Sequence, residues 1–249
     1  MITFHASAVC SVRDGYTGRP IEPSALLCTL DGVPCRPVGK PGGYLVLVNL
    51  QQGCHRLSFR GNGYQEEWVE FEAGEGTREL DITMKPGSGY PFRLSITRLT
   101  ITLLDHAAPA VGRQLWLAAP AGPEIKIAQT KAEAGNAQAR LFYKGAVPPA
   151  APGTYLISDG KESEIVSLRT IEGEIGAFGA PLLRSHSRGK VLLPAQSYHT
   201  NGQGQLMAVF REPCRVEICA GNGSLLDSVE LAQGENHRQI TWKKEKEYG

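Results

Sequence analysis

Four short runs follow one another in the chain: Gly43-Tyr-Leu-Val-Leu-Val-Asn-Leu50, Gly53-Cys-His-Arg-Leu-Ser-Phe59, Trp68-Val-Glu-Phe-Glu-Ala-Gly-Glu75 and Arg78-Glu-Leu-Asp-Ile-Thr-Met84. Apolar and polar residues alternate over 69–72, which is the period of a β-strand with one buried face. Residues 73–76 read Ala-Gly-Glu-Gly, and glycine accepts the positive φ that tight turns demand. The segment therefore predicts short strands joined by turns, with the last two runs forming a closing hairpin.

The same pattern recurs twice further along the chain, and such self-similarity is the signature of repeated modules. The second copy comprises 135–143, 152–158 and 164–174, and the third comprises 204–210, 213–219, 228–235 and 238–242. The spacing is 22 residues from Gly53 to Glu75, 21 from Gly153 to Glu174, and 22 from Pro213 to Glu235. We interpret the three copies as related β modules.

These copies predict an all-β fold of tandem small, Ig-like β-sandwich modules. Further strands are expected upstream at 2–12, 25–30, 94–104 and 114–118. Segments 86–91 and 176–181 are rich in glycine and proline and are interpreted as linkers. The predicted modules are 1–88, 91–180 and 181–249, and the third is interpreted as truncated because little strand sequence precedes it. No segment shows sustained helical spacing with caps.

The charge balance bears on the class of partner. The 249 residues carry 26 basic and 25 acidic side chains, a net charge of +1. Nucleic-acid-binding proteins usually carry a basic excess gathered on one face, so no nucleic-acid partner is expected. The 29 glycines and 16 prolines exceed average usage, which favours many turns.

Targeting signals and cysteines bear on the compartment. No basic residue precedes Arg13, although a secretory signal needs one, and no apolar run is long enough to cross a bilayer. We therefore expect cytoplasmic synthesis without a signal peptide and without membrane insertion. In that compartment cysteines are expected to be reduced and buried. Their spacing contains no C-x-x-C motif, so neither a metal nor a cofactor is expected; the six are Cys10, Cys28, Cys35, Cys54, Cys214 and Cys219.

A series of turn motifs in the first module suggests a family. They are Asp14-Gly-Tyr-Thr-Gly-Arg-Pro20, Leu30-Asp-Gly32, Gly42-Gly-Tyr44, Leu50-Gln-Gln-Gly53 and Gly61-Asn-Gly-Tyr64. Over about residues 8–85 the order resembles the carboxypeptidase regulatory-like or transthyretin-like β-sandwich. The second and third modules resemble it only through the glycine-strand-turn-strand core. The resemblance implies an accessory, adhesive or structural module without chemistry of its own, although a fold does not fix a function.

Motifs for catalysis are missing from the sequence. There is no G-x-S-x-G nucleophile elbow and no glycine-rich phosphate loop. The six histidines stand singly in different strands and loops, and the adjacent Glu66 and Glu67 point to opposite faces of a strand. We therefore expect a protein that is not an enzyme.

Two segments are candidate binding sites. The segment 184–190 contains Arg184, His186, Arg188 and Lys190, four potential cations that suit an acidic partner surface; the alternative is a solvated interdomain loop. The loop 196–203 contains Tyr198 and His199, which are able to stack on a sugar or pack against a neighbouring subunit; the alternative is a simple extended turn.

The leading hypothesis is a non-catalytic structural or interaction protein. It is an accessory or assembly component of a larger particle, phage-tail-like or contractile-injection-like, with protein partners or a homo-oligomer. This hypothesis accounts for the repeated modules and the missing motifs. The alternative is a glycan- or ligand-binding accessory module, and a third possibility is an enzyme whose site is assembled across modules.

Overall fold

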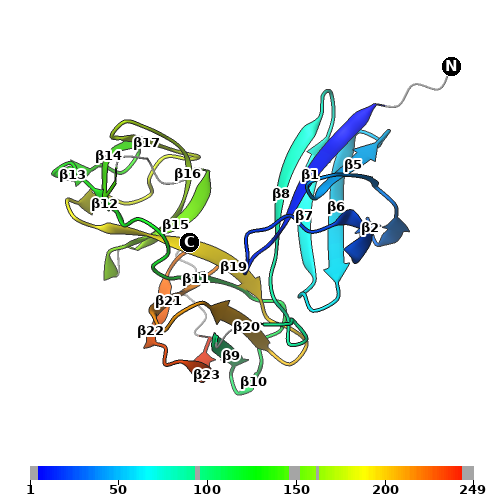
Figure 1. The fold of residues 1–249 in the computed structure, drawn as a ribbon. Helices are drawn as coiled ribbons and strands as arrows, with labels where there is room; N and C mark the ends of the chain where they lie inside the picture. Colours follow the sequence, from blue (N-terminus) through cyan, green and yellow to red (C-terminus); the bar gives the residue numbers. More distant parts are fainter. Residues whose placement is uncertain (1–4, 93–95, 146–151, 161–162, 243–249) are drawn as a thin grey trace. The chain divides into compact units, whose positions relative to one another are not determined.

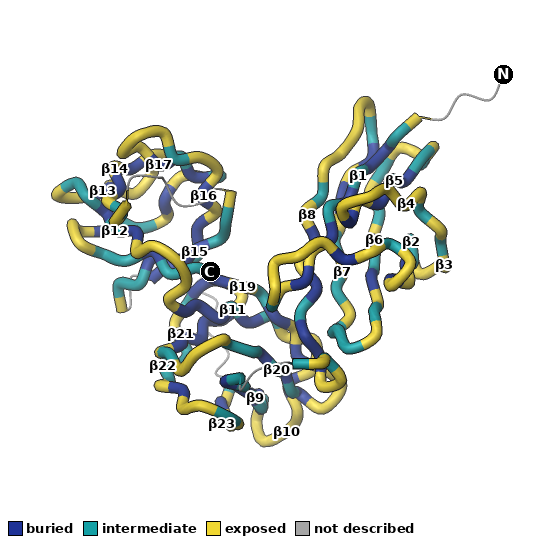
Figure 2. The backbone as a smooth tube through the Cα atoms, viewed as in Figure 1, coloured by how far each residue is buried: buried dark blue, intermediate teal, exposed yellow. Residues whose placement is uncertain are grey.

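The computed structural model describes residues 5–92, 96–145, 152–160 and 163–242, which form β-strands and one short 3-10 helix (Figure 1). The predicted all-β class is therefore confirmed. The chain divides into two compact units, Met1–Ile96 and Thr97–Gly249. Along the strands, buried and exposed residues alternate (Figure 2), as expected where one face of each sheet covers a core. The described residues include no helix of the length and hydrophobicity that crossing a membrane requires.

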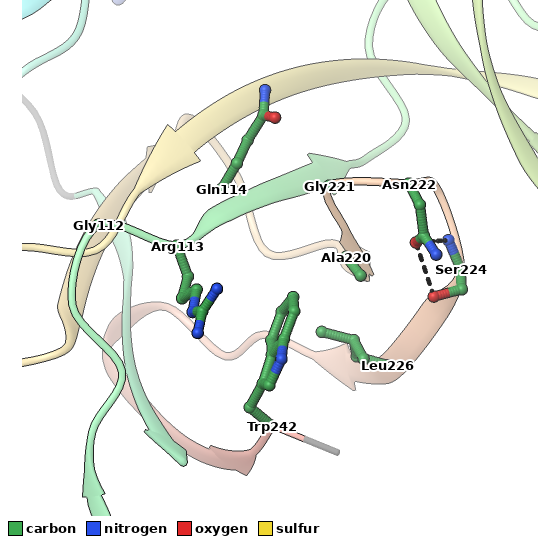
Figure 3. Close-up of a pocket in the computed structure, with 9 residues that line it drawn as sticks. All are labelled: Gly112, Arg113, Gln114, Ala220, Gly221, Asn222, Ser224, Leu226 and Trp242. Atoms are coloured by element: carbon green, nitrogen blue, oxygen red, sulfur yellow. Dashed lines mark hydrogen bonds between the residues drawn. The ribbon is translucent and has the colours of Figure 1, made fainter. Parts of the chain in front are cut away.

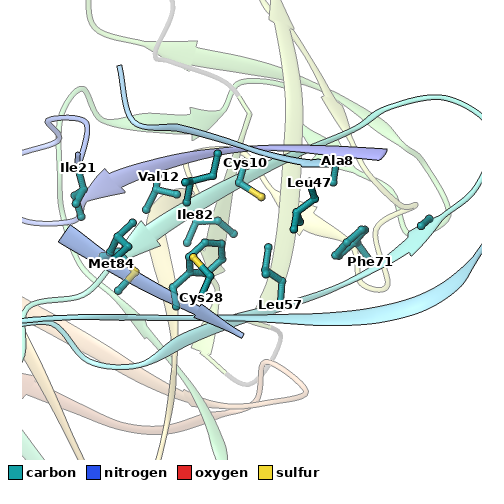
Figure 4. Packing of buried hydrophobic residues seen from close by; sticks show 14 residues of the cluster. Ala8, Cys10, Val12, Ile21, Cys28, Leu47, Leu57, Phe71, Ile82 and Met84 are labelled. Carbon is teal, nitrogen blue, oxygen red and sulfur yellow. The ribbon is translucent and has the colours of Figure 1, made fainter. Parts of the chain in front are cut away.

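The first unit is a sandwich of two four-stranded sheets. One sheet has the order β4–β5–β1–β8 and the other β3–β2–β6–β7. A 3-10 helix, Pro23–Ala25, precedes β2. Fourteen buried side chains fill the space between the sheets (Figure 4). The strands are β1 (Ala6–Asp14), β2 (Leu26–Leu30), β3 (Val33–Cys35), β4 (Val38–Lys40), β5 (Tyr44–Val48), β6 (Gly53–Gly61), β7 (Glu67–Ala73) and β8 (Arg78–Met84).

The prediction of a closing hairpin at 68–84 was wrong. β7 pairs with β6, whereas β8 pairs in parallel with β1 in the other sheet. β7 and β8 lie in facing sheets, with Phe71 and Ile82 both pointing into the core between them, so the link between the two strands crosses from one sheet to the other. Gly74 and Gly76 thus lie in a segment that crosses from one sheet to the other.

The predicted linker 86–91 packs against the first unit. The Gly87 N–H donates to the Gly63 carbonyl over 2.7 Å. The Tyr90 hydroxyl donates to the Asp14 carboxylate, which also accepts the Tyr64 hydroxyl at 2.8 Å. This segment is therefore part of the folded unit.

The second unit contains a sandwich built from both ends of its sequence. In one sheet β9 (Thr97–Asp105) pairs with β10 (Ala108–Pro109), β20 (Gln205–Phe210) and, in parallel, with β23 (Gly234–Thr241). The other sheet places β11 (Gln114–Ala118) between β19 (Val191–His199) and β21 (Arg215–Ala220), with β22 (Leu225–Glu230) at the edge. One core cluster, which includes Leu99, Leu115 and Ile240, lies between the sheets. The hairpin predicted at 229–242 was also wrong, because β22 pairs with β21 and β23 with β9.

The strands that follow β11 in the sequence form a closed barrel, which includes the first part of β19. Pairings run β12–β14–β17–β16–β15–β19, and β12 also pairs with β19, so the ring of six strands has no free edge. The barrel has its own core, which includes Leu141, Ile157 and Leu192. Beside it, β13 (Lys131–Ala132) pairs with β18 (His186–Ser187). The remaining strands are β12 (Ile125–Ile127), β14 (Gln138–Tyr143), β15 (Gly153–Ser158), β16 (Glu164–Glu172) and β17 (Ile175–Phe178), the last overlapping the predicted linker 176–181.

Strand β19 belongs to both the barrel and the sandwich. Its residues 191–194 pair with β15, and its residues 195–199 pair with β11. The structure therefore corrects the predicted division into modules 91–180 and 181–249, because strands from both ranges share the same sheets. The third copy was interpreted as truncated because little strand sequence directly precedes it. The strands that complete its sandwich are β9, β10 and β11, which come before the barrel in the sequence. The second copy supplies barrel strands instead of a sandwich.

Candidate functional site

The structure separates the six predicted binding residues. His186 is completely buried and Tyr198 is 7% exposed, packed in the sandwich core, with its hydroxyl donating to Gln196 Oε1 at 3.1 Å. Arg188 and His199 are exposed. Arg184 and Lys190 are partly buried: the Arg184 guanidinium donates to the Ser163 carbonyl at 3.4 Å, and Lys190 pairs with Asp159 in the network described next.

A buried charge network holds the segment 182–190 to the barrel. Glu164 at the start of β16 accepts the N–H of Leu183 at 2.9 Å and that of Arg184 at 3.2 Å. Its Oε1 lies 2.6 Å from His186 Nε2. The other ring nitrogen, Nδ1, lies 3.4 Å from Asp159 Oδ2, so the His186 ring lies between two carboxylates. Lys190 Nζ completes it at 2.6 Å from Asp159 Oδ1.

The network lowers the pKa of both carboxyls. Burial acts to raise the pKa of Glu164, but the hydrogen bonds from His186 and from the two backbone N–H groups outweigh it, so the pKa lies below the ordinary 4.5. Burial likewise opposes the shift at Asp159, where the hydrogen bonds of Lys190 and His186 hold the pKa below the ordinary 3.8. The segment predicted as a cationic binding loop is thus largely neutralised within the protein.

These shifts predict a loss of stability in acid. A carboxyl whose folded pKa is below its unfolded value stabilises the fold above the unfolded pKa, and this contribution disappears as pH falls through the folded pKa. The Glu164 contribution should therefore be complete at pH 6 and fade from about pH 4.5 downward. Thermal unfolding from pH 7 to pH 3 should show a steeper acid loss for the wild type than for Glu164→Gln. Parallel pH profiles for the two proteins would contradict this assignment.

A groove on the outer face of the barrel, the Phe142 groove, has a volume of about 690 Å³. Phe142 on β14 is 59% exposed and lies directly opposite Lys126 on β12. Arg140 binds Glu174 at 2.5 Å and Lys126 binds Glu124 at 2.8 Å. Arg188, from the segment before β19, makes no ion pair with the residues that the structure describes. The groove is lined by Lys126, Ile127, Ala128, Gln129, Thr130, Arg140, Leu141, Phe142, Glu174, Arg188 and Gly189.

A second concavity, the Trp242 pocket, is formed by three distant parts of the second unit and has a volume of about 330 Å³ (Figure 3). The indole of Trp242 stands between Arg113 and Leu226, and the Arg113 guanidinium carbon lies 5.7 Å from the ring centroid. Asn222 Oδ1 accepts the Ser224 N–H at 3.0 Å and hydroxyl at 2.9 Å, which fixes the turn between β21 and β22. The lining residues are Gly112, Arg113, Gln114, Ala220, Gly221, Asn222, Ser224, Leu226 and Trp242.

Sequence reasoning missed the Trp242 pocket. Its first segment, 112–114, comes more than a hundred residues before the other two, and each taken alone is an ordinary turn or strand end. The nearest predicted residue is His199, whose strand partner in the β11–β19 ladder is Gln114. A local signal existed only in Trp242 itself, a large aromatic residue just beyond the last strand.

A third concavity, in the first unit, measures about 780 Å³ and runs along β2, β3 and β4. Cys28 and Cys35 line it, and they are opposite each other in the β2–β3 ladder. Burial raises the pKa of Cys28 to about 11, so this thiol stays protonated and weakly nucleophilic at neutral pH. Within the described residues, no group of three or more histidines, cysteines and carboxylates is placed to hold a metal ion.

Comparisons with known proteins add little. No protein-family model matches the chain, and no curated protein matches it. Among solved structures, the Bacillus anthracis TIE protein gives a TM-score of 0.29 at 10% identity, covering 96% of this chain and 33% of that one. The major pilin subunit BcpA of Bacillus cereus gives 0.28 at 9%, covering 96% and 99%, and a streptococcal ancillary pilin gives 0.27 at 9%, covering 96% and 68%. The chain thus spans a third of the length of the TIE protein.

Proposed function

We propose that this protein is a non-catalytic interaction protein that binds an acidic segment of a protein partner in the Phe142 groove. Its role is that of an accessory or assembly component of a larger particle, phage-tail-like or contractile-injection-like. The observation that carries the proposal is the exposed ring of Phe142 among the cations Lys126, Arg140 and Arg188.

The chemistry of the groove suits a protein surface. Aromatic and arginine side chains supply most of the binding energy at protein interfaces. Arg188 has no carboxylate partner among the described residues, so it is able to bind one without first breaking an ion pair. Phe142 offers an apolar surface between the cations. The partner should therefore present an apolar side chain flanked by aspartate or glutamate.

The barrel gives this groove a rigid base. Lys126 and Phe142 project from two paired strands of a ring without free edges. The N–H of Arg188 donates to the Thr130 carbonyl at 3.1 Å, and the N–H of Gly189 donates to the Ile127 carbonyl at 2.9 Å. Because this part of the backbone is already held in place, little conformational entropy is lost on binding, which favours affinity.

We also propose that the first unit belongs to the carboxypeptidase regulatory-like or transthyretin-like group, an accessory class. Its support is the conformation of two glycines in the motifs that carry the resemblance. Gly18 has φ +72°, and Gly43 has φ +79° with no room for a side chain, since a Cβ there would lie 2.7 Å from the Val12 carbonyl oxygen. Both positions thus require the residue that the motif supplies.

Cross-linking from inside the groove tests the proposal. A photoreactive benzoyl-phenylalanine at position 142 of the full chain should cross-link in its native cells to a defined partner, or to a second copy, at an acidic peptide identified by mass spectrometry. Adding Arg188→Glu should reduce that product about tenfold, because a close charge pair is replaced by repulsion. The matched control places the same probe at Leu183, which is 79% exposed and outside the groove lining. Products that are equal at both positions, or unchanged by Arg188→Glu, would overturn the proposal.

A further inference from the structure

We propose that the Trp242 pocket binds a sugar acid, with its carboxylate on Arg113 and its ring against Trp242. This site is separate from the Phe142 groove and does not depend on the function proposed for that groove. Three features of the pocket support this ligand: its size, its charge and the rigidity of its walls.

The size of the pocket selects a small ligand. Its volume of about 330 Å³ lies at the lower end of the range for small-molecule sites, roughly 300–1,000 Å³. The apolar wall, Trp242 and Leu226, lies next to a polar wall, Asn222 and Ser224, which lies beyond Leu226 at the turn before β22 (Figure 3). A compact ring with one apolar face and several hydroxyl groups matches both walls.

The charge of the pocket selects an acid. Arg113 is the one charged residue among the nine that line it, and none of the nine is acidic. The carboxylate of Asp105 lies 3.9 Å from the Arg113 guanidinium, at the limit of an ion pair, and Asp105 is not part of the lining. With 46% of its side chain exposed, Arg113 remains accessible to a ligand. A guanidinium binds a carboxylate through charge-assisted hydrogen bonds, which are stronger than the neutral bonds that a plain sugar makes.

The walls are held in place before any ligand arrives. The backbone N–H of Arg113 donates to Thr200 Oγ1 at 2.9 Å, and the Thr200 hydroxyl in turn donates to the Ala110 carbonyl. The backbone N–H of Trp242 donates to the Leu104 carbonyl at 2.6 Å, which ties the backbone of Trp242 to the end of β9. A site whose groups are already oriented loses less entropy on binding.

Titration of the full chain with three probes tests the proposal. The probes are glucuronate, glucose and cyclohexanecarboxylate, followed by calorimetry and by quenching of tryptophan fluorescence. Glucuronate should bind most tightly, because it alone combines a carboxylate with a hydroxylated ring. Arg113→Gln should weaken glucuronate binding about tenfold or more and leave glucose binding unchanged, since only the carboxylate loses its charge-assisted hydrogen bonds.

Controls separate the site from its surroundings. Arg19→Gln changes an exposed arginine of the first unit and should leave glucuronate affinity unchanged. The double variant Phe142→Ser/Arg188→Glu should also leave it unchanged, so a failure of the groove proposal is distinguishable from a failure here. Trp242→Phe should remove most of the fluorescence response to glucuronate, whereas Trp68→Phe should keep it.

Three results would overturn the proposal. The first is glucuronate binding no more tightly than glucose, which would remove the role of the carboxylate. The second is unchanged glucuronate binding by Arg113→Gln, which would show weak association elsewhere on the protein. The third is cyclohexanecarboxylate binding as tightly as glucuronate, which would show that the hydroxyl groups are not recognised.

Discussion

Replacing Glu164 by alanine is expected to lower the free energy of unfolding of the second unit by about 3–5 kcal/mol, because removal of one partner of a buried pair leaves the other charge uncompensated. His186 is fully buried and would retain only Asp159, whose Oδ2 lies 3.4 Å from its ring nitrogen. The N–H groups of Leu183 and Arg184 would also lose their acceptor. Denaturant unfolding at pH 7 measures the loss.

A double-mutant cycle separates this network from a general effect of truncation. His186→Ala alone should also destabilise the unit, and adding it to Glu164→Ala should cost much less than the sum, because both changes remove the same interaction. Glu174→Ala breaks the exposed pair with Arg140 and serves as the matched control, with little change in stability expected. Additive effects of the two buried changes would show that Glu164 and His186 act independently.

Replacing Leu192 by alanine is expected to cost about 2–5 kcal/mol, the usual effect of a cavity left by a buried leucine. Leu192 is 2% exposed in the barrel core, but it lies on β19, whose second half completes the sandwich sheet. A small cluster that includes Leu156 and Ala195 packs where barrel and sandwich meet. The loss should therefore reach both parts of the second unit.

Hydrogen exchange followed by mass spectrometry measures this coupling. Protection should fall by the same amount in barrel peptides covering 155–157 and in sandwich peptides covering 99–103. The matched control is Leu57→Ala, which removes an equally buried leucine from the core of the first unit. That variant should affect peptides of the first unit. Lower protection confined to the barrel in Leu192→Ala would show that the barrel unfolds separately.

The sequence predicts the strands better than their partners. Residues 114–118 were expected as a strand and form β11 with the same limits. Alternation shows which side chains of a strand are buried, but Phe71 and Ile82 would look the same in one sheet or in two facing sheets. The pairing of β9 with β20 joins residues more than a hundred positions apart, and no local pattern encodes it. Strand existence was therefore predictable, while the crossover and the inserted barrel were not.

In the candidate site, too, the sequence predicted the segment but not the contacts of its side chains. His186 was interpreted as one of four surface cations because its neighbours in sequence are basic. Its actual partners are Glu164 and Asp159, which precede it by 22 and 27 residues and meet it only through the barrel fold. Arg188 in the same segment is exposed and lines the Phe142 groove. Charge composition located the segment, whereas tertiary packing decided which of its side chains reach solvent.

The place where the barrel joins the sandwich has a consequence for the architecture of the second unit. Ala118 and Ala195 are directly opposite each other in the β11–β19 ladder, so the chain leaves the sandwich and returns to it at a single rung. Opposed residues in such a ladder lie about 5 Å apart, a gap that a tight turn spans. The barrel is therefore inserted into the sandwich at one rung of the β11–β19 ladder, between two positions that are as close together as the ends of a hairpin turn.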